Sequence, residues 1–167
     1  MIKEGLQLIG DFMVEQLVKV LDDQGHRNTG ALQESLRSKV TQSGGGYEIT
    51  IYGKDYAKYV DRGIPSGVWV NPYALAEWVE QKGIATGEKE IKNIAFAIRH
   101  KIFKEGSPTK GSLRFSKSGK RDEFIKVMLD ENSKVIFKMV FDVFSREVAV
   151  TLRNTIAKER TTFETVS

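Results

Sequence analysis

Two short stretches decide the fold: TGALQESL at residues 29–36 and, after one hairpin-like segment, DYAKYVDRG at residues 55–63. Thr29 is placed as the N-cap of a short helix whose buried side holds Leu32 and Leu36. Both stretches combine apolar residues on one side with glycines that turn the chain. Neither contains a nucleophile beside a base, a metal-binding cluster or a phosphate-binding loop. This patterning favours surfaces for other copies of the chain over a catalytic pocket.

The residues that flank the first stretch predict a helix and a hairpin. Apolar residues recur at spacings of three and four over residues 2–24, which predicts an amphipathic helix that Gly25 stops. Alternation of apolar and polar residues predicts a second strand over residues 47–52, paired with a first over residues 39–43. Three glycines lie between them at residues 44–46, more than a two-residue turn needs, so we expect a loose hairpin tip.

The middle of the chain reads as short helices joined by glycine and proline turns. Residues 55–61 predict one or two helical turns, and residues 68–70 a brief strand. Asparagine followed by proline at residues 71–72 predicts the start of a helix that stops near Gly83. A continuous stripe of isoleucine and alanine predicts the next helix, which follows Gly87 and ends before the glycine, serine and proline at positions 106–108.

The C-terminal part predicts a long helix from about residue 122 to residue 158, bent or broken near residues 130–133. Its apolar positions recur every four residues at Val140, Phe144, Val148, Leu152 and Ile156, and Ile136, Met139 and Val143 widen the stripe. So broad an apolar face needs a partner. It can pack on the rest of the fold or on a neighbouring subunit, and the sequence leaves both open.

Together these elements predict an α+β fold with a small antiparallel sheet packed by helices and a long C-terminal helical element. We expect an α+β domain over residues 1–105, a flexible basic loop over 106–121, the helical element over 122–160 and a frayed tail over 161–167.

Positive charge is concentrated in one segment. The chain has a net charge of +4 and a pI of about 9.2. Residues 99–121 hold eight Lys or Arg residues against one acid, Glu105. Such a cluster can bind phosphates, remain a solvated loop or pair with an acidic neighbour. The candidate contacts to DNA in a channel, or to a neighbour, are Lys101, Lys104, Lys110, Arg114, Lys117, Lys120 and Arg121.

Enzyme signatures are poorly represented, and we predict no enzyme, metal or cofactor. The sequence has no cysteine, and its histidines, His26 and His100, are far apart and have no metal-ligand spacing. No serine lies in a G-x-S-x-G turn, and the adjacent acids at residues 22–23 and 130–131 would point in different directions on a helix. No apolar run approaches the roughly 20 residues needed to cross a bilayer, so we expect no membrane partner.

Aromatic residues gather in the middle third of the chain. Tyrosine and tryptophan serve well at interfaces because each offers a large area and one polar group. The predicted subunit-interface residues are Tyr56, Tyr59, Asp61 and Arg62 on the turn, and Phe144, Val148 and Leu152 on the C-terminal helix.

The order of the two stretches around a hairpin resembles the HK97 gp10-like family of bacteriophage head–tail connector and tail-completion (neck) proteins. The first motif is matched by Thr29, Gly30, Leu32, Ser35 and Leu36, and the second by Tyr56, Ala57, Tyr59, Val60, Asp61 and Gly63. The resemblance covers residues 5–64 well and the helix around 72–104 loosely. The sequence departs from the pattern at Asp61 and Ile64, and the element after Asp122 has no counterpart.

The resemblance implies a structural protein of the virion, part of the neck or upper tail, assembled in the host cytoplasm. Such proteins form homo-oligomeric rings through which DNA passes, so the implied partners are other copies, portal, connector or tail proteins, and packaged double-stranded DNA held without sequence specificity. The alternative from the residues themselves is a sequence-independent nucleic-acid-binding protein that uses residues 99–121.

Overall fold

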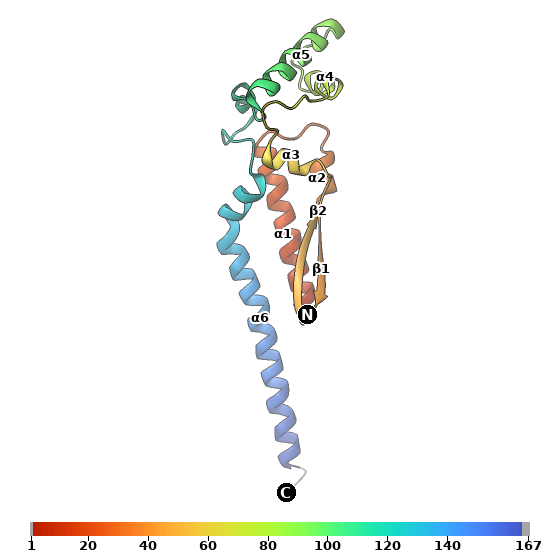
Figure 1. The fold of residues 1–167 in the computed structure, drawn as a ribbon. Coiled ribbons are helices and arrows are strands. Elements are labelled where there is room, and N and C mark those ends of the chain that lie inside the picture. The colour runs from red at the N-terminus through yellow and green to blue at the C-terminus, as the bar shows by residue number, and fades with distance from the viewer. Residues whose placement is uncertain (1, 165–167) are drawn as a thin grey trace. The chain divides into compact units, whose positions relative to one another are not determined.

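The computed structural model describes the backbone of residues 2–164 and the side chains of residues 2–158. The fold class is confirmed as a small α+β arrangement, with a two-stranded antiparallel sheet and a long C-terminal helix (Figure 1). In chain order the elements are α1 (Ile2–Asp23), α2 (Ala31–Ser35), β1 (Arg37–Ser43), β2 (Gly46–Tyr52), α3 (Ala57–Arg62), α4 (Pro72–Gln81), α5 (Glu88–Glu105), the 3-10 helix η1 (Lys110–Phe115) and α6 (Phe124–Glu164).

The chain forms two compact units that are discontinuous in sequence. Unit 1 contains residues 1–15, 37–52 and 129–167, and unit 2 contains residues 16–36 and 53–128. The domains expected from the sequence are each continuous in the chain, whereas the two units are not. α1 and α6 each contribute one part to unit 1 and the other part to unit 2.

The core of unit 1 joins α1, the hairpin and α6. Leu6, Ile9 and Val40 are buried together, and partly buried residues of α6 pack against them: Ile136, Met139, Val140 and Val143. Glycines let the elements approach closely. A Cβ at Gly5 would lie 2.7 Å from a methyl of Val143, and one at Gly10 would lie 2.8 Å from the Ser38 Cβ. Part of the apolar face of α6 therefore packs on its own chain.

The hairpin of β1 and β2 closes more tightly than the sequence suggested. Ser43 pairs with Gly46, so only Gly44 and Gly45 form the turn. Both have positive φ values, 58° and 81°, which suit the two-residue turns that match the twist of a hairpin. The expected loose tip is wrong, because the third glycine is the first residue of β2.

In unit 2, α4 and α5 form a helical pair (Figure 1). The Asn71 side chain accepts a hydrogen bond from the Tyr73 N–H at 2.9 Å, and Pro72 occupies the first turn, as expected. Val79, Ala85 and Ile91 are buried between the two helices and the turn that joins them.

Residues 68–70 are not a strand. Trp69 instead stacks on Phe103 of α5, with ring centroids 4.1 Å apart, and the Arg99 guanidinium lies 4.6 Å from the indole. Earlier in the same loop, Ile64 forms an isolated antiparallel bridge with Ser107. Aromatic packing on a helix replaces strand pairing there, because no neighbouring strand is within reach in unit 2 as described.

The basic segment and α6 also differ from expectation. Residues 110–115 form η1 rather than an irregular loop. α6 runs without interruption through residues 130–133 and continues to Glu164, so part of the expected tail is helical. Residues 165–167 lie outside the described residues.

Candidate functional site

A concave pocket lies inside unit 2. Its volume is about 390 Å³, and its apolar lining comes from α3, α4, α5 and the loops beside them: Val60, Ile64, Leu75, Trp78, Ile98 and Ile102. Polar lining residues include His26, Asn71, Thr109, Ser112 and Arg121. An apolar cavity with few polar groups is typical of a site that receives an apolar ligand or side chain.

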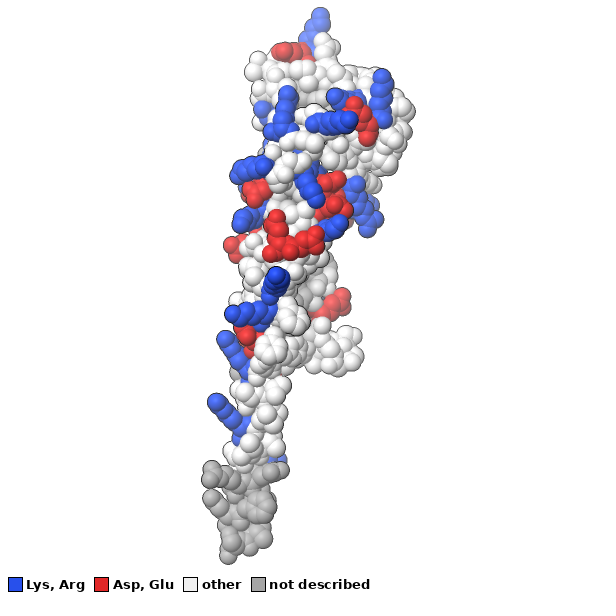
Figure 2. Space-filling model, turned by 90° about the vertical axis from the view of Figure 1, so that its left-hand side faces the viewer, with Lys and Arg blue, Asp and Glu red and all other residues white. Residues whose placement is uncertain are grey.

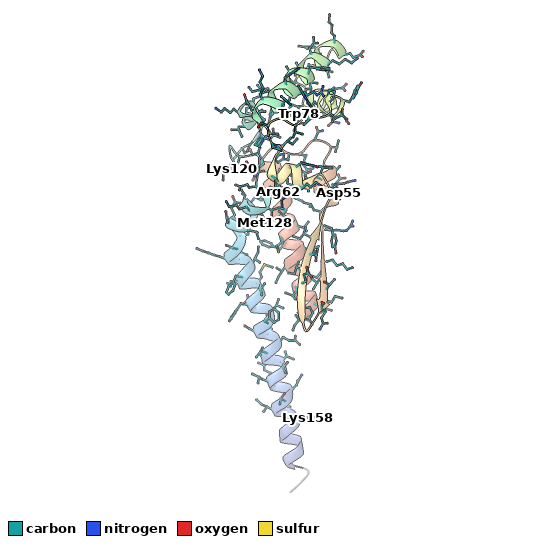
Figure 3. All side chains as sticks on the ribbon, in the orientation of Figure 1. Asp55, Arg62, Trp78, Lys120, Met128 and Lys158 are labelled. Atoms are coloured by element: carbon teal, nitrogen blue, oxygen red, sulfur yellow. The ribbon has the colours of Figure 1, made fainter. Side chains whose placement is uncertain are left out.

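The aromatic turn predicted as a subunit contact borders this pocket. Tyr56 and Tyr59 both line it, and they remain 44% and 55% exposed. The Lys58 ammonium lies 5.0 Å from the centre of the Tyr59 ring. Arg62, at the end of α3, is also exposed (Figure 3). These side chains are accessible to a partner.

Asp61 has a role within unit 2, and its predicted part in a subunit contact stays a prediction. Its carboxylate oxygen accepts a hydrogen bond from the Ile125 N–H at 3.0 Å, and its backbone carbonyl accepts one from the Glu123 N–H at 2.6 Å. Amide groups in the first turn of a helix have no partner within the helix. Asp61 therefore caps α6 and ties the end of α3 to its start.

The prediction that Arg121 contacts DNA or a neighbour is wrong, because the residue is buried. Only 9% of the residue is exposed. Its guanidinium donates to three backbone carbonyls, those of Gln24 at 3.0 Å, Gly25 at 3.2 Å and Ser112 at 3.2 Å. Two of these carbonyls follow the last turn of α1, where a cation is favourable. Arg121 links the end of α1 to Ser112 of η1 within unit 2.

His26 lies beside this arginine. Its Nε2 is 3.1 Å from the Arg121 carbonyl oxygen. Burial, helped by the positive charge of Arg121, lowers the pKa of His26 to about 4. The imidazole is therefore neutral at physiological pH, and it belongs to the polar part of the pocket lining.

The other six predicted basic contacts are exposed: Lys101, Lys104, Lys110, Arg114, Lys117 and Lys120. Some have partners within the chain. Lys117 lies 3.5 Å from Asp23, and Lys101 lies 4.0 Å from Glu105. On the face shown in Figure 2, basic side chains are interspersed with acidic ones and do not gather in one patch.

The interface residues predicted on α6 lie on its uncovered side. Phe144, Val148 and Leu152 are 40%, 58% and 57% exposed. Two further aromatic residues, Phe137 and Phe141, are more exposed, at 74% and 63%. We define the α6 stripe as Phe137, Phe141, Phe144, Val148, Leu152 and Ile156. One face of α6 therefore packs within unit 1, which is the first of the two alternatives, and the adjoining face is exposed. Packing of that face on a neighbouring subunit stays a prediction.

Sequence reasoning missed the pocket and the two phenylalanines. The residues of α4 and α5 that line the pocket were recognised only as the apolar faces of helices. The concavity depends on contacts between segments far apart in sequence, such as Trp78 with Phe115, whose ring centroids are 5.4 Å apart. Phe137 and Phe141 were visible in the sequence but fall outside the four-residue repeat that begins at Val140.

The described residues hold no cluster of three or more His, Asp or Glu side chains that could bind a metal ion. None of the helices within that part of the chain is long and apolar enough to cross a bilayer. Comparison with protein-family models, with curated proteins and with solved structures found no match.

Proposed function

We propose that this chain is a structural protein of a tailed bacteriophage virion. In this proposal it forms a ring at the head–tail junction or at the upper end of the tail, and DNA passes through the ring. The observation that supports it best is that one chain exposes two unlike apolar surfaces, the pocket bordered by Tyr56 and Tyr59 and the α6 stripe. A cyclic ring uses head-to-tail contacts, so each subunit needs two different surfaces that fit each other.

The two motifs that resemble the connector family have clear structural roles here. The Ser35 hydroxyl donates to the Leu32 carbonyl at 2.7 Å and accepts from the Lys54 N–H at 3.0 Å, so the first motif fixes the exit of the hairpin. Gly63 ends α3 with φ of 75°. Ser35 and Gly63 therefore stabilise the local backbone, and Tyr56 and Tyr59 between them remain exposed and available for contacts.

Native mass spectrometry of the full chain, alone and with portal and tail proteins of the same phage, tests the proposal. A single species at a fixed multiple of the subunit mass is expected. A strictly monomeric protein in both conditions would count against a ring.

Sequence-independent nucleic-acid binding remains the alternative, and it would use the exposed cations of the basic segment. It predicts that binding to free double-stranded DNA weakens steeply with salt and is lost on charge reversal of Lys110, Arg114 and Lys117. A virion protein that forms rings and has no appreciable affinity for free DNA would favour the structural role. Steep, salt-dependent binding by a monomer would favour the alternative.

A further inference from the structure

The pocket of unit 2 has a size and lining that suit aromatic side chains. An apolar cavity of ~150 Å³ holds one benzene ring. At about 390 Å³, the pocket has room for roughly two. Tyr56 and Tyr59 line the pocket and are about half exposed, so their rings are accessible to an insert from outside.

The α6 stripe offers a matching insert. Phe137 and Phe141 are four residues apart, so their side chains are neighbours on one side of the helix. The three phenylalanines of the stripe expose roughly 350 Å², if an aromatic side chain presents about 200 Å² when free. The three aliphatic residues of the stripe extend this surface. A stable protein interface buries about 800 Å² per partner. The three phenylalanines alone therefore supply nearly half of one side, and the rest of the contact falls to residues around the pocket.

The net charges of the two units favour a contact between unit 1 of one copy and unit 2 of another. Unit 2 contains 17 Lys or Arg residues against 12 Asp or Glu residues, and unit 1 contains 9 against 10. Two copies that meet through α6 alone bring together parts of nearly zero net charge. A contact between unit 1 of one copy and unit 2 of another joins a slightly negative part to a positive one, which speeds encounter and disfavours pairing of two basic units.

We propose that Phe137 and Phe141 of one copy insert into the pocket of unit 2 of a second copy. The proposal rests on the proposed ring and names the contact that builds it. The insert and the pocket are different surfaces of the same chain, so every copy can receive one neighbour and enter another. Such a contact repeats head to tail, and it closes a ring if the rotation between subunits allows.

Cysteine cross-linking tests this contact, because the natural chain has no cysteine. One variant contains Phe141→Cys, and the other contains Ala74→Cys in the pocket lining on α4. The two full-length chains, one of them isotopically heavy, are mixed and mildly oxidised, and the disulfide-linked dimers are weighed by mass spectrometry. Matched controls are Val135→Cys, exposed on α6 outside the stripe, and Ala97→Cys, exposed on α5 outside the lining.

The expected product is the mixed dimer of Phe141→Cys with Ala74→Cys, formed several-fold faster than any dimer that contains a control cysteine. Predominant Phe141→Cys homodimers would overturn the proposal in favour of pairing between two α6 helices. Rates equal to those of the controls would also overturn it, and would leave the pocket to a small molecule or another protein.

Assembly of two further variants separates this contact from the ring itself. Phe137→Ser with Phe141→Ser removes the insert, and Ala74→Trp fills the pocket. Each variant alone should be monomeric in native mass spectrometry under conditions where the natural chain assembles. A mixture should stop at one-to-one dimers, because a single intact contact remains. Rings that persist in both variants would refute the insertion and leave the proposed function standing, whereas a natural chain that never assembles, even with its virion partners, would refute the function.

Discussion

Replacement of Arg121 by methionine tests the internal role that the structure gives this residue. Methionine keeps the length of the stem but removes the guanidinium and its bonds to three carbonyls. Hydrogen bonds from charged donors contribute about 1.5–3 kcal/mol each. The total loss is smaller than their sum, because burial lowers the pKa of Arg121 and removal of a buried charge recovers part of its desolvation cost. We therefore expect the free energy of unfolding to fall by about 2–4 kcal/mol.

Urea unfolding followed by tryptophan fluorescence measures this loss where it should occur, because Trp69 and Trp78 both lie in unit 2. With a slope of about 2 kcal/mol per molar urea, the midpoint should fall by roughly 1–2 M. The matched control is Lys120→Met, which removes an exposed cation one residue away and should change stability by no more than about 0.5 kcal/mol. If Arg121→Met has the same midpoint as this control, Arg121 is not the internal link described here.

Three further predictions concern single positions. Gly63→Ala should destabilise the protein by at least about 2 kcal/mol more than Gly67→Ala in thermal unfolding, because both have positive φ but only at Gly63 would a Cβ collide with a backbone carbonyl oxygen, that of Ser107; equal losses would contradict this. The pKa of His26 is about 4 when folded and about 6.5 when unfolded, so the stability gained from its neutral form is complete above pH 6.5 and is lost as the pH falls toward 4. His26→Gln should reduce the difference between urea midpoints at pH 7 and pH 4.5, and an unchanged difference would refute the assignment. Asp61→Ala should cost about 1 kcal/mol in the same urea assay through loss of the cap on the Ile125 amide, and a cost near zero would refute it.

Local patterns predicted the local elements of this fold. The spacing of apolar residues located α1 and α5, and the asparagine and proline at residues 71–72 located the start of α4, because these signals act within one or two turns of helix. The same patterns could not distinguish a strand from an extended segment at residues 68–70. That distinction depends on whether Trp69 meets another strand or the rings of α5.

The candidate site was only partly predictable for the same reason. The tyrosines of α3 could be named from their sequence motif, but the pocket beside them requires α4, α5 and the segment after α5 to converge. Arg121 illustrates the limit most clearly. Its neighbours Lys120 and Asp122 are also charged, and Lys120 is exposed. Arg121 is buried because its guanidinium binds carbonyls nearly a hundred residues earlier in the chain. Charge density along a sequence identifies basic segments but does not show which of their cations are used inside the fold.

The most direct measurement is a cryo-electron microscopy reconstruction of the phage particle that contains this chain. The account predicts a ring of this subunit at the neck or at the top of the tail, in which the α6 stripe and the pocket of every copy are covered by neighbouring subunits. A particle that lacks the chain, or that contains it as a single copy with both surfaces open to solvent, would contradict the account.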